Sequence, residues 1–336
     1  MYSFDSLARA HGSSLINGIV KSRHEDFRVD EIMPVEPSGE GEHLWLKIEK
    51  KGSNTEWVAR QLAKLAGVKS MAVSYAGLKD RHGITTQWFS IHLPGQADPD
   101  LTVLPEDVHI LQAIRHNRKL KRGTLSGNHF SLCIRDISGP LDLLEQRLQS
   151  IAEQGIPNYF GEQRFGHDMG NLDQAEKLFQ GELKRLDRHE RGLYLSAARS
   201  WIFNLVLSER IRQNNWNSYL SGDVFMLDGR SACFADDHSD DLLERIQHMQ
   251  IHPTGPLWGK GESMAKKDCL DLEMTIASSC KLFCEGIAAA GMDQERRALR
   301  LAVKQMHWQF NNDQLLLDFE LSAGSFATMV LREIIA

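Results

Sequence analysis

The sequence LLLDFEL at residues 315–321 has an apolar side chain at every second position. A period of two is typical of a β-strand with one buried face. The same alternation occurs near the start of the chain, at residues 27–29 and again at 44–48, with the turn-rich residues 34–41 between them. Sheet-forming segments are therefore expected at both ends of the chain.

The middle of the chain is richer in helical patterns. Apolar spacings of three and four residues predict helices at 54–67, 141–154, 195–212 and 241–249. Short strands are expected at 73–75, 87–93, 130–134 and 224–227. A helical middle between sheet-forming ends favours an α/β fold in which one discontinuous domain is interrupted by an inserted domain.

Composition indicates a globular protein. The chain has 336 residues, of which 42% are hydrophobic and 25% charged, enough for roughly two domains. No apolar run approaches the roughly 18 to 20 residues that cross a bilayer, and no secretory pattern opens the chain. Five scattered cysteines favour neither a disulfide framework nor a zinc site. We expect a soluble cytoplasmic protein without a structural metal.

One basic run stands out against the acidic average. The formal net charge is −6, which on average disfavours a nucleic-acid partner, yet residues 115–122 hold five arginines or lysines and no acid. Arg118, Lys119 and Lys121 are candidates to neutralise RNA phosphates. The alternative is a solvated charged loop, and composition alone does not choose between them.

The segment 75–88, YAGLKDRHGITTQW, concentrates reactive side chains after a short expected strand. Asp80 lies between Lys79 and Arg81, and neighbouring cations favour the ionised form of a carboxyl group. A carboxylate can act as a nucleophile or a base. A Gly-x-Lys-Asp sequence is also common in ordinary polar turns, so the segment by itself supports both interpretations.

Two further segments combine aromatic and polar residues. Asn128 and Phe130 follow the basic run and are suited to reading and stacking a base, whereas the alternative for Phe130, as for Phe27 and Phe326, is core packing. The segment 157–166, PNYFGEQRFG, places Arg164 among aromatic residues and glycines. It is either a contact for RNA backbone or an aromatic hinge.

Several common enzyme classes lose support from the sequence. The chain has no Walker A loop, Rossmann glycine fingerprint, Gly-x-Ser-x-Gly elbow or His-Glu-x-x-His helix. These absences disfavour the usual nucleotide-binding, serine hydrolase and zinc protease interpretations.

Taken together, the motifs resemble the tRNA pseudouridine synthase D (TruD) family over nearly the whole chain. The resemblance rests on segments in the family's order: 21–27, GLKD at 77–80 with Thr85 and Gln87, 127–130, 157–166, 195–204, and 323–333. One departure is Gly83, where the family pattern leads us to expect alanine. Glycine adds backbone freedom there and removes no reactive group.

The resemblance implies an isomerase that converts uridine to pseudouridine, at position 13 of tRNA, without a metal or other cofactor. It implies a pseudouridine synthase domain with a mixed, largely antiparallel sheet over residues 1–155 and 304–336, interrupted by an inserted domain at 156–303. Asp80 would be the nucleophile and Lys21 its charge partner. The residues that the family pattern places on the substrate base are Phe27, Asn128, Phe130 and Phe326. Candidates for the RNA backbone are Lys79, Arg118, Lys119, Lys121 and Arg164.

Two other functions remain as alternatives. A non-catalytic RNA-binding protein would use the same aromatics and basic run but would have no use for a carboxylate flanked by cations. A hydrolase using Asp80 with His82 would release a free base or sugar, whereas an isomerase leaves the RNA mass unchanged. No heptad pattern demands a dimer, so a monomer is expected.

Overall fold

The computed structural model describes residues 2–101, 103–183, 185–236 and 240–335. The chain divides into two compact units. Among the described residues, the sheet unit comprises Leu15–Leu144 and Val303–Ser325, and the helical unit comprises residues 2–14, Glu145–Ala302 and Phe326–Ile335.

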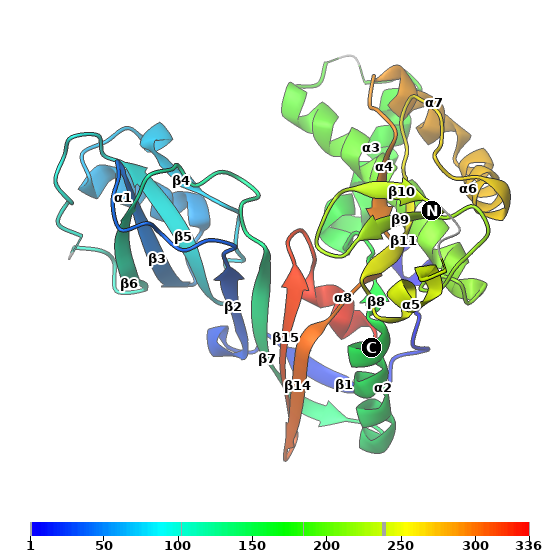
Figure 1. Ribbon diagram of the computed structural model, residues 1–336, viewed down its shortest axis with the longest axis horizontal. Coiled ribbons are helices and arrows are strands. Elements are labelled where there is room, and N and C mark those ends of the chain that lie inside the picture. The colour runs from blue at the N-terminus through cyan, green and yellow to red at the C-terminus, as the bar shows by residue number, and fades with distance from the viewer. Residues whose placement is uncertain (1, 102, 184, 237–239, 336) are drawn as a thin grey trace. The chain divides into compact units, whose positions relative to one another are not determined.

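The sheet unit is built on one mixed sheet, in the order β14-β15-β7-β2-β5-β3-β6 (Figure 1). Its strands are β1 (Asn17–Val20), β2 (Phe27–Ile32), β3 (His43–Lys51), β4 (Val73–Tyr75), β5 (Ile84–His92), β6 (Val108–His116), β7 (Gly127–Ser138), β14 (Lys304–Asn311) and β15 (Gln314–Ser322). Off the main path, β1 pairs with β7 and β4 with β5. Within the described residues β2 and β5 run parallel, and the other pairs of this sheet are antiparallel. The mixed, mostly antiparallel sheet expected from the sequence is confirmed.

Helix α1 (Thr55–Leu65), which the sequence predicts at residues 54–67, packs on this sheet. It begins after Asn54, whose side chain accepts a hydrogen bond from the Glu56 amide at 2.8 Å, and it ends before Gly67, which has a φ of 64°. The buried face of α1 shares a hydrophobic cluster with residues of β3, β4 and β5. Burial of this apolar surface holds the helix against the strands.

Some strands differ from the sequence-based expectation. β5 begins at Ile84 rather than 87, because it is buried on both faces and its first polar residues show no alternation. β6 and β14 were not predicted. In each, the register shifts against the neighbouring strand, which interrupts the period of two on which such a prediction depends.

The helical unit contains two small sheets and most of the helices (Figure 1). One sheet has the order β10-β9-β11-β12, from Cys233–Ala235, Val224–Leu227, Ile251–Leu257 and Glu295–Ala298, and the other pairs β8 (Ile156–Pro157) with β13 (Arg300–Leu301). The helices are α3 (Gly170–Phe179), α4 (Arg188–Arg212), α5 (Leu242–Gln247), α6 (Lys267–Ser279), α7 (Lys281–Ala289) and α8 (Ala327–Arg332); α2 (Leu141–Gln154) joins the units in sequence. Helix α4 starts before the expected residue 195, because Asp187 and Glu190 form a capping box.

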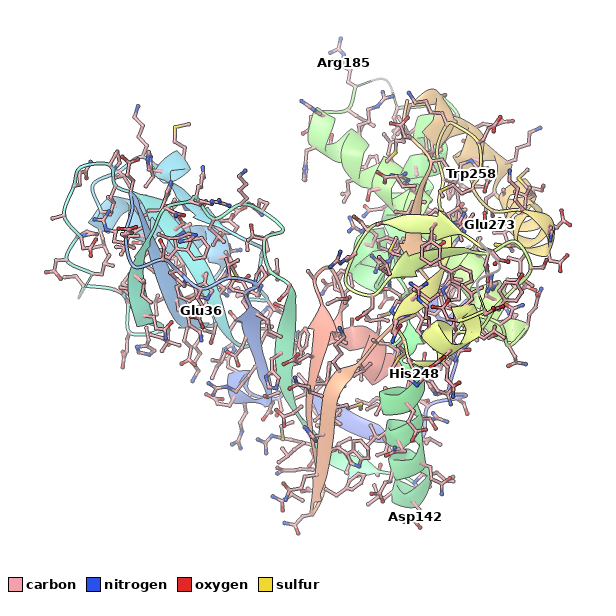
Figure 2. All side chains as sticks on the ribbon, in the orientation of Figure 1. Glu36, Asp142, Arg185, His248, Trp258 and Glu273 are labelled. Atoms are coloured by element: carbon pink, nitrogen blue, oxygen red, sulfur yellow. The ribbon has the colours of Figure 1, made fainter. Side chains whose placement is uncertain are left out.

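Charged side chains are paired inside the helical unit. Glu273 of α6, labelled in Figure 2, is buried and forms an ion pair with Arg296 of β12 at 2.6 Å. Arg210 and Asp223 form a second buried pair at 2.7 Å. Pairing of this kind offsets the cost of removing charges from water. Over the residues that the structure describes, no helix is long and apolar enough to cross a membrane.

Residues near both ends of the chain pack within the helical unit. Arg332 donates a hydrogen bond to the carbonyl of Leu7 at 2.6 Å, and the Tyr159 hydroxyl donates to the carbonyl of Ala8 at 2.9 Å. Residues 2–14 and 326–335 therefore belong to this unit, whereas the sequence placed them with the other domain. The expected division of the chain at residues 155 and 304 stays a prediction.

Candidate active site

One face of the sheet brings together residues from five strands. Val29 of β2 is paired with Thr85 of β5 and with Phe130 of β7. Thr85 is in turn paired with Lys50 of β3, and Phe130 with Phe319 of β15. Because paired residues in neighbouring strands point to the same face, these five side chains form a row across the sheet. Aromatic and polar groups thus share a face that also carries the apolar cluster beneath α1.

Asp80 lies beside this row, in the loop of residues 76–83 that joins β4 to β5. Its side chain is 34% exposed and forms an ion pair with Lys21, which follows β1. The other carboxylate oxygen accepts a hydrogen bond from the His82 amide at 3.0 Å. Two residues that are 59 positions apart in the sequence are therefore joined at the catalytic candidate.

The environment of Asp80 favours its ionised form. Partial burial by itself raises the pKa of this carboxyl group, but the hydrogen bond and charge of Lys21 and the amide of His82 together hold the pKa below its usual value. Asp80 is therefore a carboxylate at neutral pH, as a nucleophile or base must be.

Three hydrogen bonds fasten the loop that carries Asp80. The Thr55 hydroxyl, at the start of α1, accepts from the Lys79 amide at 3.1 Å and donates to the Gln87 side chain at 2.9 Å. The Gln87 amide group donates to the carbonyl of Gly77 at 3.0 Å. The loop is thus tied to both the helix and β5, which limits the movement of Asp80.

The side chain of Lys79 is turned inward. Its ammonium group lies 2.8 Å from Glu31 of β2, and the side chains of Lys79 and Glu31 are 6% and 0% exposed. Glu31 also accepts a hydrogen bond from the Trp88 amide at 2.8 Å. This placement speaks against the expectation that Lys79 contacts an RNA phosphate, because its charge is already neutralised inside the protein.

Lys50 is a functional candidate that the sequence reasoning missed. It has no exposed surface, and its ammonium group donates to the carbonyls of Ser53 at 2.7 Å and Asp80 at 3.1 Å. Burial lowers the pKa of Lys50 to about 8. The signal was present, because Lys50 continues the every-second-residue pattern of residues 44–48.

The aromatic candidates form a continuous group. The Phe27 and Phe130 rings meet edge to face at 6.4 Å, and Phe130 stacks on Phe319 at 5.4 Å. The Lys21 ammonium group lies 4.0 Å from the centre of the Phe27 ring. The ion pair of Asp80 is thereby in contact with the aromatic group.

Two polar atoms on this face have no partner. Over the described part of the chain, the Thr85 hydroxyl and the side-chain oxygen (Oδ1) of Asn128 are buried without a hydrogen bond. Asn128 is paired with Glu31 on one side and Leu321 on the other, so it lies one step along the strands from Phe130. Buried polar atoms without partners are costly, and a polar ligand can satisfy them.

Gly83 has a packing role that the sequence did not reveal. A Cβ atom at this position would lie 2.5 Å from the main-chain oxygen of Phe27. The expectation of added backbone freedom is therefore incomplete: the glycine lets the end of the Asp80 loop approach β2 closely.

The remaining candidates divide between the units. In the sheet unit, Arg118, Lys119 and Lys121 are exposed. Leu120, between the two lysines, is buried and anchors this basic run. Phe326, 40% exposed, and Arg164, which donates to Ser196 at 3.2 Å, belong to the helical unit. No group of side chains suited to bind a metal occurs in the part of the chain that the structure describes.

Comparisons with known proteins agree with this arrangement. A structure search finds the fold in a candidate tRNA pseudouridine synthase D from Methanosarcina mazei, with a TM-score of 0.72 and 21% identity, covering 98% of this chain and 95% of that one. The two proteins therefore share one fold over nearly their whole lengths.

Sequence comparisons identify the family to which the chain belongs. The family model described as tRNA pseudouridine synthase D (TruD) matches residues 7–172 and 168–334. Similar curated proteins of that name include one from Hydrogenovibrio crunogenus, 48% identical over 99% of this chain and 96% of its own length. Another, from Methylococcus capsulatus, is 48% identical over 99% and 95%. The chain belongs to the tRNA pseudouridine synthase D family, and the resemblance noted from its motifs is confirmed.

Proposed function

We propose that this protein isomerises uridine 13 of tRNA to pseudouridine, with Asp80 as the nucleophile. The observation that carries the proposal is the Asp80–Lys21 ion pair in contact with the Phe27 ring. This arrangement supplies an ionised carboxylate beside an aromatic group on one sheet face. Family membership supports the reaction class.

Substrate binding begins with extrusion of the uridine from the RNA stack, at a cost of a few kcal/mol. Stacking on an aromatic ring returns roughly 1 to 3 kcal/mol per base, and Phe130 and Phe27 are the proposed surface. The unpartnered oxygen of Asn128 is a suitable acceptor for the uracil N3–H group. Phe326, in the helical unit, is a further proposed contact of the base.

The reaction exchanges one glycosidic bond for another. The N1–C1′ bond breaks, a C1′–C5 bond forms, the hydrogen leaves C5, and a proton is bound at N1, so the composition of the RNA is unchanged. Asp80 attacks either C6 of the base or C1′ of the ribose and forms a covalent intermediate, which divides the exchange into easier steps. Lys21 keeps the attacking group ionised.

Four cations are the proposed contacts of the RNA backbone. Arg118, Lys119 and Lys121 serve in the sheet unit, with Arg164 in the helical unit. Lys79 is left out because its charge is paired inside the protein. As the sequence leads us to expect, the proposed enzyme is a cytoplasmic monomer and uses no metal or other cofactor.

The test is release of tritium from tRNA carrying [5-³H]uridine and made in cells that lack the modification. We expect release by the wild type and none by Asp80→Asn, with tRNA binding retained in both. Asp30→Asn is the matched control. Asp30 is also a carboxylate, and it lies in β2 next to Val29, but its side chain points to the opposite face of the sheet. Wild-type rates in Asp80→Asn would remove Asp80 from the mechanism, and tight binding without release by the wild type would favour a non-catalytic RNA-binding protein.

The position in tRNA needs a separate measurement. Carbodiimide modification followed by primer extension maps each pseudouridine to one nucleotide. We expect a single new stop that reports position 13. A stop at another position would retain the activity but refute the proposed site of modification.

A further inference from the structure

A cavity of about 630 Å³ lies in the sheet unit, and none of Phe27, Phe130 and Phe319 lines it. Its walls come from α1, from β4 and from the segment of residues 119–122. Four cationic side chains line it, Arg60, Lys119, Lys121 and Arg122, against one carboxylate, Glu56. Two segments that are far apart in the sequence, α1 and residues 119–122, thus deliver positive charge to one concave surface.

Most of this charge is unpaired. Within the described ranges, Arg60, Lys119 and Lys121 form no ion pair, whereas Arg115 at the start of the same basic run is paired with Asp98 at 2.6 Å. The cavity wall also contains Ser74, whose buried hydroxyl has no hydrogen-bond partner among the described residues. The cavity therefore offers donors and positive charge that the fold itself does not use.

The fourth cation, Arg122, is held against Tyr75 in the cavity wall. Its guanidinium group lies 4.2 Å from the centre of the Tyr75 ring and donates to the Tyr75 hydroxyl at 2.8 Å. Tyr75 also packs against Phe89, at 5.9 Å between ring centres, and is 8% exposed. Because the ring is covered, Tyr75 offers no free face on which a base could stack. The chemistry of the cavity suits an anion better than a nucleobase.

The cavity is mechanically connected to the Asp80 loop. Tyr75 ends β4 and leads directly into that loop, and the amide of Gly123 donates to the carbonyl of Ala76 at 2.8 Å. Helix α1, which contributes Arg60, holds the Lys79 amide through Thr55 at 3.1 Å. A ligand in the cavity would contact the same helix, strand and segment that hold the loop in place.

We propose that this cavity binds a backbone phosphate of the tRNA, at a nucleotide other than the uridine that is isomerised. The inference rests on the proposed function in one respect, that tRNA is the substrate. It places Lys119 and Lys121, already proposed as contacts of the RNA backbone, in one site with Arg60, which the basic run alone did not indicate. A phosphate fits because it accepts several hydrogen bonds and needs positive charge and no stacking surface.

The test compares Arg60→Ala with Lys64→Ala. Lys64 is on the same helix, carries the same charge, is exposed, and does not line the cavity. We expect Arg60→Ala to raise KM for tRNA roughly two- to fivefold, the range for one exposed charge contact, with kcat within about twofold. The slope of log binding constant against log salt should become shallower by about 0.9. Lys64→Ala should change neither quantity, and Arg60→Lys should recover most of the binding.

Each result separates this inference from the proposed function. If Arg60→Ala and Lys64→Ala have the same KM and the same salt slope while the wild type releases tritium, the cavity does not bind tRNA and the proposed function stands. If neither the wild type nor the variants release tritium, but Arg60→Ala binds tRNA more weakly than the wild type and Lys64→Ala do, the phosphate site stands and the proposed function fails. Circular dichroism checks that both variants fold.

Discussion

The Lys50 ammonium group lies 3.1 Å from the main-chain oxygen of Asp80, on a side chain with no exposed surface. It also donates to the carbonyl of Ser53, so one buried cation joins the end of β3 to the Asp80 loop. Burial lowers its pKa to about 8 from a usual 10.5. Between these values the unfolded chain keeps a proton that the folded protein has lost. The contribution of Lys50 to folding stability therefore increases as pH rises through this window.

Lys50→Met removes this dependence while keeping the side chain long and apolar. We expect the free energy of unfolding of the wild type, relative to the variant, to rise from pH 7.5 to pH 10. Urea denaturation of both proteins at several pH values measures it. A constant difference over that range would show that Lys50 titrates near its usual pKa, and would contradict the link to burial.

Lys21→Met should shift the acid side of the pH profile of kcat/KM. Without the hydrogen bond and charge of Lys21, burial raises the pKa of Asp80 and less of the carboxylate remains ionised as pH falls. The limb of kcat/KM on the acid side should therefore shift to higher pH. The control is Lys51→Met, since Lys51 pairs with Glu25 at 2.7 Å on the exposed surface. An unmoved limb in Lys21→Met would mean that Asp80 is not the titrating group.

The buried pair of Lys79 and Glu31 should be important for folding. Glu31→Gln keeps an acceptor for the Trp88 amide but leaves the Lys79 charge unpaired, which costs about 3 to 5 kcal/mol in a buried site. The double variant Glu31→Gln with Lys79→Met should lose less stability than the single changes added together. Urea denaturation measures the free energy of unfolding of the two single variants and of the double variant. Glu25→Gln is the control, because Glu25 belongs to an exposed ion pair with Lys51. Additive losses would show that the two charges do not interact.

Phe130→Leu separates base stacking from core packing. Leucine keeps most of the apolar volume, so the stability cost should stay below about 1.5 kcal/mol. Loss of a stacking surface worth roughly 1 to 3 kcal/mol should lower kcat/KM for tRNA by roughly 5- to 150-fold. Phe319→Leu is the matched control, because Phe319 stacks on Phe130 at 5.4 Å and is fully buried. Equal activity in the two variants would assign Phe130 to the core alone.

Much of the fold was readable from local patterns. Alternation at residues 27–29 and 315–321 marked strands with one buried face, alternation at 44–48 marked β3, and the spacing after Asn54 marked α1. Local patterns failed where the period of two was broken, as in β6 and β14, or hidden by burial on both faces, as at the start of β5.

The chemistry of the candidate site was also largely present in the sequence. Asp80 was recognisable because its neighbours are cations and because the motif resembles a known family. Lys79 shows the limit of this reasoning, since a lysine in a polar loop looks like a phosphate contact until Glu31, 48 positions earlier, is found against it.

What the sequence determined by itself was the identity of the reactive groups, the strands and helices that carry them, and the family. Only the tertiary structure decided which charges are neutralised and which remain available. Strand order and the packing of α1 bring Lys21 to Asp80 and Lys50 to the Asp80 carbonyl, and they place Arg60 in one cavity with Lys119 and Lys121. Those contacts join residues far apart in the chain. Their strength depends on burial, which no local pattern of side chains specifies.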